Sequence, residues 1–158
     1  MKISKIYWET SLNFLSLPPK PNKHHTTMEL KDPIAEAIRY QENAKQIILD
    51  NEKIVDGCYD DGKYVKMAGH TMWTGCLIAL DYALQIKVKG RKDIKDYKTA
   101  AAKRSKKLVD AITFGYITIH LNLSYDGDKR VSTMKEGRRL ADEIIEWCRN
   151  NAATPAAA

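Results

Sequence analysis

Apolar positions recur at helical spacing along most of the chain. Between Pro33 and about Glu52 they form one stripe with a period near 3.6 residues, which predicts an amphipathic helix. Asp32 followed by Pro33 is typical of an N-cap and a first helical position. The sequence Asp-Gly at 56–57 and the sequence Asp-Asp-Gly at 60–62 then predict a turn after this helix.

The next segment, from about Asp61 to Lys87, is apolar over a much wider arc of its helical surface. It also contains small residues, among them Gly69 and Gly75, that permit a neighbouring helix to approach closely. A helix that leaves little purely polar face belongs in the interior of a bundle. We therefore expect this helix to be the central element.

Three further helices follow in the pattern of apolar residues. Their expected ranges are 93–103, 106–124 and 132–150, with Ser105 and Ser132 as N-caps of the last two. Residues 112–123 are rich in β-branched and aromatic side chains and could form a strand, but their 3.6-residue period and the lack of a partner strand favour a helix. The fold class predicted is all-α, an antiparallel up-down bundle of four to five helices.

The bundle is expected to occupy residues 28–150. Three prolines within 18–21 disfavour a helix, so residues 1–27 are expected to be an extended or flexible N-terminal segment, and Met28 could be the true translation start. Residues 151–158 are rich in alanine and low in complexity, and are expected to form a disordered C-terminal tail.

Composition narrows the class of protein only modestly. With 29% charged and 44% hydrophobic residues, the chain has the composition of an ordinary globular protein. No apolar run approaches the roughly 20 residues needed to cross a bilayer, so neither membrane insertion nor a signal peptide is expected. The three cysteines form no paired motif, and Cys76 and Cys148 lie on apolar helix faces, which predicts core thiols in the cytoplasm.

The formal net charge of +6 does not by itself indicate nucleic-acid binding. Four lysines against one glutamate give residues 1–27 a net charge of +3, which is half of the total. The other basic groups, at 103–107, 128–130 and 138–139, are typical of solvated helix surfaces. Nucleic-acid contact would require them to converge on one face with stacking aromatic residues.

Two histidines are the first candidates for chemistry. His70, beside Trp73, and His120 belong to two different predicted helices, and the imidazoles could approach each other if these helices pack together. The alternative is a hydrogen-bonded, partly buried position for each histidine. No metal-ligand spacing accompanies them, and no metal or cofactor is predicted.

Tyrosines and aspartates flank the same two helices. In an up-down bundle, Tyr64 at the start of one helix can lie beside Tyr125 and Asp126 at the end of its neighbour. Such a cluster could be a satisfied structural group or a ligand-binding groove. The candidate ligand-binding or polar cluster consists of Tyr64, His70, Trp73, Tyr116, His120, Tyr125 and Asp126. No nucleophile motif or phosphate loop is present, so no catalytic residue is assigned.

Several segments resemble an uncharacterised family of small bacterial helical-bundle proteins, a domain of unknown function, over Met28 to Asn150. The segments that carry the resemblance are NAK (43–45), YDDGKYV (59–65), GHTMWTGCLIAL (69–80), YITIHL (116–121), YDG (125–127) and IIEWC (144–148). That family is similar in helix layout to the HEPN superfamily. The resemblance implies a bundle of four or five helices that is often dimeric, and either a ribonuclease or toxin or a non-catalytic binding partner.

The catalytic HEPN pattern is an arginine followed four to six residues later by a histidine. His120 stands where that histidine could fall, but the residues ahead of it are Phe114, Gly115 and Tyr116. We therefore expect a non-catalytic HEPN-like module that binds a partner or itself, as a possible homodimer. One alternative is a ribonuclease or toxin that uses His120 with a non-standard basic partner. Another is a protein that binds a small ligand or a nucleotide.

Overall fold

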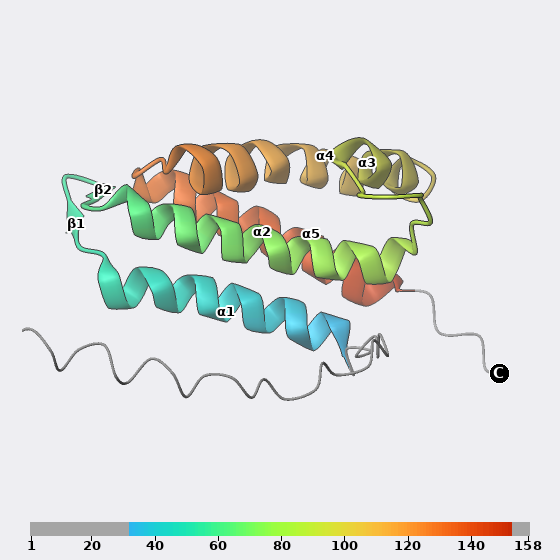
Figure 1. The fold of residues 1–158 in the computed structure, drawn as a ribbon, viewed down its shortest axis with the longest axis horizontal. Helices are drawn as coiled ribbons and strands as arrows, with labels where there is room; N and C mark the ends of the chain where they lie inside the picture. The colour runs from blue at the N-terminus through green and yellow to red at the C-terminus, as the bar shows by residue number, and fades with distance from the viewer. Residues whose placement is uncertain (1–31, 153–158) are drawn as a thin grey trace, which may run out of the picture.

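The computed structural model describes residues 32–152 and is built almost wholly from helices (Figure 1). The elements in chain order are α1 (Pro33–Asn51), β1 (Ile54–Val55), β2 (Cys58–Tyr59), α2 (Gly62–Leu84), α3 (Ile94–Ala102), α4 (Lys106–Gly115), the π-helix η1 (Tyr116–Asp126) and α5 (Val131–Asn151). The all-α class is confirmed, and the long helices alternate in direction along the bundle. The predicted segment 1–27 and residues 153–158 of the predicted tail lie outside the described residues.

Side-chain caps fix the starts of α1, α2 and α4, and Asp93 caps α3. The Asp32 carboxylate accepts hydrogen bonds from the backbone N–H groups of Ile34 and Ala35, and Asp61 accepts one from Lys63. The Ser105 hydroxyl accepts one from the backbone of Leu108 at 3.2 Å. These bonds satisfy donors that the first turn of a helix leaves without partners. The predicted caps at Asp32 and Ser105 are therefore confirmed.

The cap predicted at Ser132 is wrong, because α5 already begins at Val131 and no side chain caps it. The preceding turn is held by Asp128, whose carboxylate accepts hydrogen bonds from the Arg130 backbone at 3.0 Å and from the Thr133 hydroxyl at 2.9 Å. The pKa of Asp128 is lowered by its hydrogen bonds to Arg130 and Thr133. This carboxylate holds the turn before α5 but does not accept from the backbone N–H groups of the helix's first turn.

The ends of two helices also differ from those predicted from the spacing of apolar residues. The second helix ends at Leu84 rather than Lys87, because Gln85 adopts a left-handed conformation with φ 50°. The predicted helix 106–124 is α-helical only to Gly115 and continues as a π-helix to Asp126. The strand alternative for residues 112–123 is excluded.

The turn expected after the first helix is a small β-hairpin. Asp56 and Gly57 have φ of 50° and 76°, the pair of positive values found in a type I′ turn, and β1 pairs with β2 in antiparallel register. The hairpin also contacts the turn before α5, since the Val131 N–H donates to the Gly57 carbonyl at 3.0 Å. It thereby joins the ends of α1, α2 and α5.

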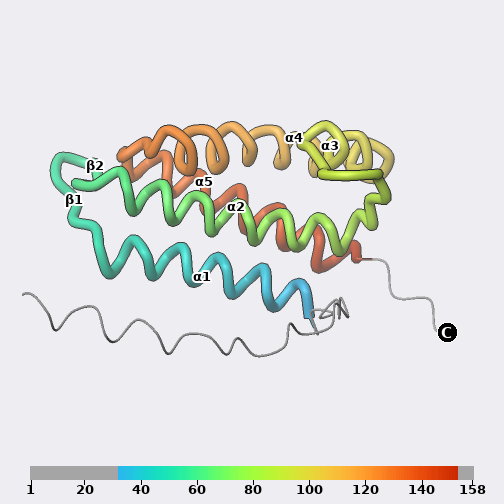
Figure 2. Tube along the Cα trace, viewed as in Figure 1, coloured from blue at the N-terminus to red at the C-terminus, as the bar shows by residue number. Residues whose placement is uncertain are grey.

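The second helix, α2, is the central element, as expected. The helices α4 and η1 follow each other without a break, and we call them together the α4–η1 rod. The helix α2 lies between α1 and this rod, with α5 behind it (Figure 2). Close approach depends on small residues: a Cβ atom at Gly75 would lie 2.9 Å from the Ala37 carbonyl oxygen in α1. Cys76 and Cys148 are fully buried, as expected, and burial raises the pKa of the Cys148 thiol to about 12. Within residues 32–152, every helix is too short or too polar to cross a membrane.

Candidate functional site

A cavity of about 400 Å³ opens between α2, η1 and the connection from α2 to α3. It is about twice as large as a second cavity between α4 and α5, which measures about 210 Å³. Its lining residues are His70, Trp73, Thr74 and Leu77 from α2, Arg91, Lys92, Asp93, Ile94 and Tyr97 from the connection and α3, and Tyr116 and His120 from η1. We call this cavity the α2–η1 pocket.

Three aromatic rings form one wall of the α2–η1 pocket. The Tyr116 and His120 rings lie 5.1 Å apart between centroids, with their planes tilted by 33°. The Trp73 ring lies 6.0 Å from Tyr116 and 5.9 Å from His120. Trp73 is only 6% exposed, so its ring is held by the core on one side and meets the pocket on the other.

The backbone of η1 places Tyr116 and His120 on this wall. Segments of π-helix are rare and are often found at functional sites. Gly115, just before η1, is buried, and a Cβ atom there would lie 3.0 Å from Ile144 Cδ1 and 3.5 Å from the Trp73 ring. A glycine at this position therefore lets Ile144 of α5 pack closely against the start of η1, whereas the Trp73 ring lies at an ordinary contact distance.

His120 is in an unusual electrostatic position. Its Nδ1 atom is buried and has no hydrogen-bond partner within the described part of the chain. Burial lowers the pKa of the imidazole below its usual 6.5, and the nearby His70 and Arg91 lower it further. The ring is therefore neutral at pH 7, which suits stacking and also proton acceptance.

Acidification is expected to destabilise the wild-type protein more than a His120→Gln variant. Because the pKa is lowered in the folded state, the unfolded chain takes up a proton more readily as the pH falls below 6.5. Stability that is present above pH 6.5 is then lost as the pH falls through the pKa of the folded state. Urea unfolding between pH 7.5 and 5.5 measures this difference. Parallel pH dependences in the two proteins would contradict the lowered pKa.

The connection from α2 to α3 contributes two basic side chains, Arg91 and Lys92, to the lining of the α2–η1 pocket. The connection contains Lys87, Lys89, Arg91 and Lys92 within six residues. The Lys92 ammonium donates to Asp81 Oδ1 at 2.7 Å, and the Tyr97 hydroxyl donates to the same oxygen at 2.7 Å. Asp81 thus attaches the connection and α3 to α2. Arg91 takes part in no hydrogen bond or ion pair within residues 32–152.

The structure separates the predicted cluster into two groups. His70, Trp73, Tyr116 and His120 line the α2–η1 pocket. Tyr64, Tyr125 and Asp126 instead lie at the hairpin end of the bundle, as expected for residues at the start of one helix and the end of its neighbour.

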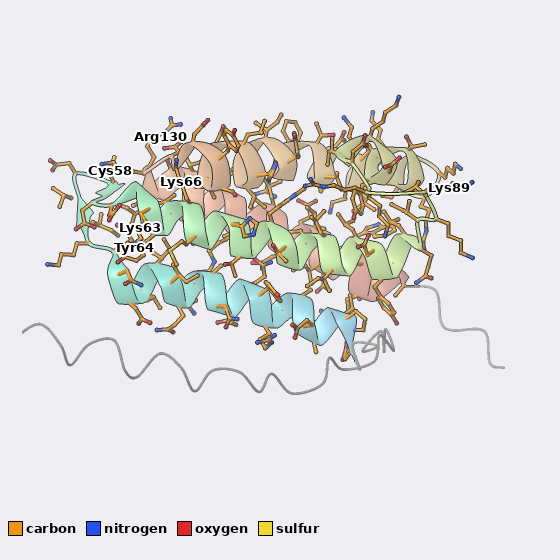
Figure 3. All side chains as sticks on the ribbon, viewed as in Figure 1. Cys58, Lys63, Tyr64, Lys66, Lys89 and Arg130 are labelled. Atoms are coloured by element: carbon orange, nitrogen blue, oxygen red, sulfur yellow. The ribbon has the colours of Figure 1, made fainter. Side chains whose placement is uncertain are left out.

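At the hairpin end, Tyr64 lies beside Lys63, whose ammonium is 5.1 Å from the tyrosine ring centroid, far from Lys89 in the α2–α3 connection (Figure 3). Tyr125 is 74% exposed and Asp126 is also exposed. These three residues do not contribute to the pocket.

Sequence reasoning missed Arg91, Lys92 and Tyr97 as pocket residues. The available signal was the run of four basic residues at 87–92, which falls between helices rather than on a solvated helix face. Within residues 32–152, no three histidine, cysteine, aspartate or glutamate side chains are grouped closely enough to hold a metal ion. The side chains of the α2–η1 pocket instead combine aromatic surface, hydroxyl groups and positive charge.

Comparison with known proteins supports a family but gives no activity. The profile of a family described as Domain of unknown function (DUF5618) matches residues 32–150. A solved structure described as a protein of unknown function from Dyadobacter fermentans is similar to 75% of this chain and to 94% of its own length. The two share 42% sequence identity, with a TM-score of 0.72. No curated protein matches the chain.

Proposed function

We propose that this chain, which belongs to the family described as Domain of unknown function (DUF5618), is a binding module that holds a small molecule in the α2–η1 pocket. The observation that carries the proposal is that the aromatic wall of Trp73, Tyr116 and His120 lines the same cavity as basic residues of the connection. A volume of about 400 Å³ falls within the range of small-molecule sites. The proposal assigns the predicted non-catalytic binding function to this pocket.

Filling the α2–η1 pocket is expected to weaken ligand binding strongly. Thr74 is half-buried and lines the pocket, so Thr74→Phe places a large ring in the cavity. A panel of nucleosides, nucleotides, amino acids, aromatic acids and sugars is screened by ligand-observed NMR. We expect at least one compound to bind the wild-type protein and to bind Thr74→Phe at least about tenfold more weakly, which corresponds to about 1.4 kcal/mol.

Thr99→Phe is the matched control, because Thr99 is exposed on α3 and does not line the pocket. This variant is expected to bind as the wild-type protein does. A compound that binds should also raise the free energy of unfolding, by roughly 2.7 kcal/mol at a concentration of 100 times its Kd. The proposal fails if the whole panel leaves the wild-type protein unaffected, or if Thr74→Phe folds normally and binds equally well.

A second candidate function is RNA cleavage with His120 and a non-standard basic partner. The fold brings Arg91 to the same pocket as His120, close enough to affect the pKa of the imidazole. Cleavage requires positive charge near the phosphate and a group that transfers a proton. RNA incubated with the wild-type protein, His120→Ala and Arg91→Ala tests this candidate. Equal, negligible cleavage by all three eliminates it.

We also propose that the helices have a HEPN-like layout and that the protein binds a protein partner or a second copy of itself. Phe114, Ile117 and Leu121 are exposed apolar residues along one side of the α4–η1 rod, and they support self-association. Light scattering of the wild-type protein and Leu121→Glu tests the dimer. A wild-type protein that stays monomeric at concentrations well above those in a cell would remove it.

We also propose that the protein is bacterial, that it is located in the cytoplasm, and that residues 28–150 form the folding unit. The three cysteines, Cys58, Cys76 and Cys148, are free thiols, which supports a reducing compartment. Detection of the protein in a periplasmic or secreted fraction would contradict the location. Loss of the folded state in a chain shortened to residues 28–150 would contradict the boundary.

A further inference from the structure

We propose that the ligand of the α2–η1 pocket carries one flat aromatic ring system and one anionic group, with the ring on the Tyr116–His120 face and the anion on the Arg91 guanidinium. This inference rests on the proposed binding function and specifies the chemistry of its ligand. It follows from the positions of the aromatic and basic side chains around the cavity.

The aromatic wall presents a surface suited to a ring. Tyr116 and His120 both line the cavity, with ring centroids 5.1 Å apart and planes tilted by 33°, so that a ligand in the cavity meets aromatic surface from both residues. Trp73 is fixed behind them by the core and meets Tyr116 edge to face. Offset stacking of a ligand ring on such a face is favourable and requires little ordering of side chains that are already packed.

Arg91 is the cation available to an anionic group in the pocket. Lys92 also lines the pocket, but its ammonium is already paired with Asp81 at 2.7 Å. Lys87 and Lys89 belong to the same connection but do not line the cavity. An arginine can bind a carboxylate or a phosphate through two parallel hydrogen bonds, which also fixes the orientation of the ligand.

The start of α3 cannot serve the anion instead. Asp93 lines the pocket, and its carboxylate accepts hydrogen bonds from the backbone of Lys95 at 2.7 Å and of Asp96 at 3.1 Å. The Asp96 carboxylate in turn accepts one from the Asp93 backbone. This capping box fills the donors of the helix start with negative charge, which repels an anion. The anionic group is therefore directed to Arg91.

The attachments of the connection hold Arg91 near the aromatic wall. Lys92 and Tyr97 both donate to Asp81 on α2, so the residues that follow Arg91 are fixed to the same helix that carries Trp73. A cavity of about 400 Å³ is near the lower end of the range for ligand sites. It has room for a single ring system with its anionic substituent.

Three kinds of probe separate the two halves of the ligand. Adenosine 5′-monophosphate and indole-3-acetate carry a ring and an anion, adenosine and indole carry a ring alone, and ribose 5-phosphate and acetate carry an anion alone. Affinities for the full-length chain are measured at constant ionic strength by calorimetry or ligand-observed NMR. We expect at least one ring-plus-anion probe to bind about tenfold more tightly than both of its partial probes.

Arg91→Gln should reduce the affinity for the ring-plus-anion probe to that of the ring alone and leave the ring-only probe unchanged. Lys89→Gln removes the same charge from the same connection outside the cavity and is expected to have no effect. If neutral and anionic ring probes bind equally and Arg91→Gln binds both as the wild-type protein does, the inference is overturned while the binding function stands. If no probe or panel compound binds, both are overturned.

Discussion

Replacing Gly69 with alanine is expected to lower the free energy of unfolding by about 2 kcal/mol or more. A Cβ atom at this position would lie 2.7 Å from the backbone nitrogen of Ser124 and 2.9 Å from the backbone carbon of Leu123. Backbone atoms cannot rotate away, so α2 and η1 would have to move apart. The better helix propensity of alanine offsets only about 0.5–1 kcal/mol. Urea unfolding followed by circular dichroism measures the loss.

Gly137→Ala is the matched comparison, since it also adds one methyl group to a buried helical glycine near Leu123. There the new Cβ atom would meet the end of the Leu123 side chain, Cδ1, at 2.7 Å. A side-chain end can change rotamer, so a smaller loss of stability is expected than in Gly69→Ala. A Gly69→Ala protein as stable as the wild type would contradict the close packing of α2 against η1.

Helices whose ends depend on local chemistry could be predicted from the sequence. Asp32 and Ser105 cap their own helices, and each bond joins residues within three positions of each other. The end of α2 gave no such signal, because Gln85 adopts positive φ without a glycine. The choice between α-helix and π-helix after Gly115 also left no trace in the pattern, since both bury Ile119 and Leu123.

In the candidate site, too, contacts between neighbouring helices could be predicted from the sequence, whereas the position of a residue in a connection could not. The approach of His70 and His120 could be foreseen, since it required only that two neighbouring helices pack together. Arg91 could not be foreseen by a search for an arginine shortly before the histidine. Its place in the pocket depends on the path of a connection that Asp81 fixes through Lys92. Arg91 therefore lines the same pocket as His120, although no arginine stands shortly before His120 in the sequence.

Trp73→Ala is expected to have the largest effect on both stability and binding. The indole is 6% exposed and packs against Tyr116 and His120, so its removal leaves a cavity in the core beside the pocket. Truncation of a buried tryptophan costs about 3–5 kcal/mol, which is a large part of the stability of a single domain. Urea unfolding measures this loss of stability. Binding is measured with the compound that binds the α2–η1 pocket of the wild-type protein most tightly, at a temperature where the variant stays folded.

Leu80→Ala separates the two effects. Leu80 is fully buried on the same helix but does not line the pocket, and its truncation costs about 2–5 kcal/mol. Leu80→Ala should therefore lose stability and retain ligand affinity, whereas Trp73→Ala should lose both. Trp73→Phe keeps a ring and is expected to lie between the wild type and Trp73→Ala in each measurement. If folded Trp73→Ala binds as tightly as Leu80→Ala, the aromatic wall only stabilises the core, and the ligand must be sought at another surface.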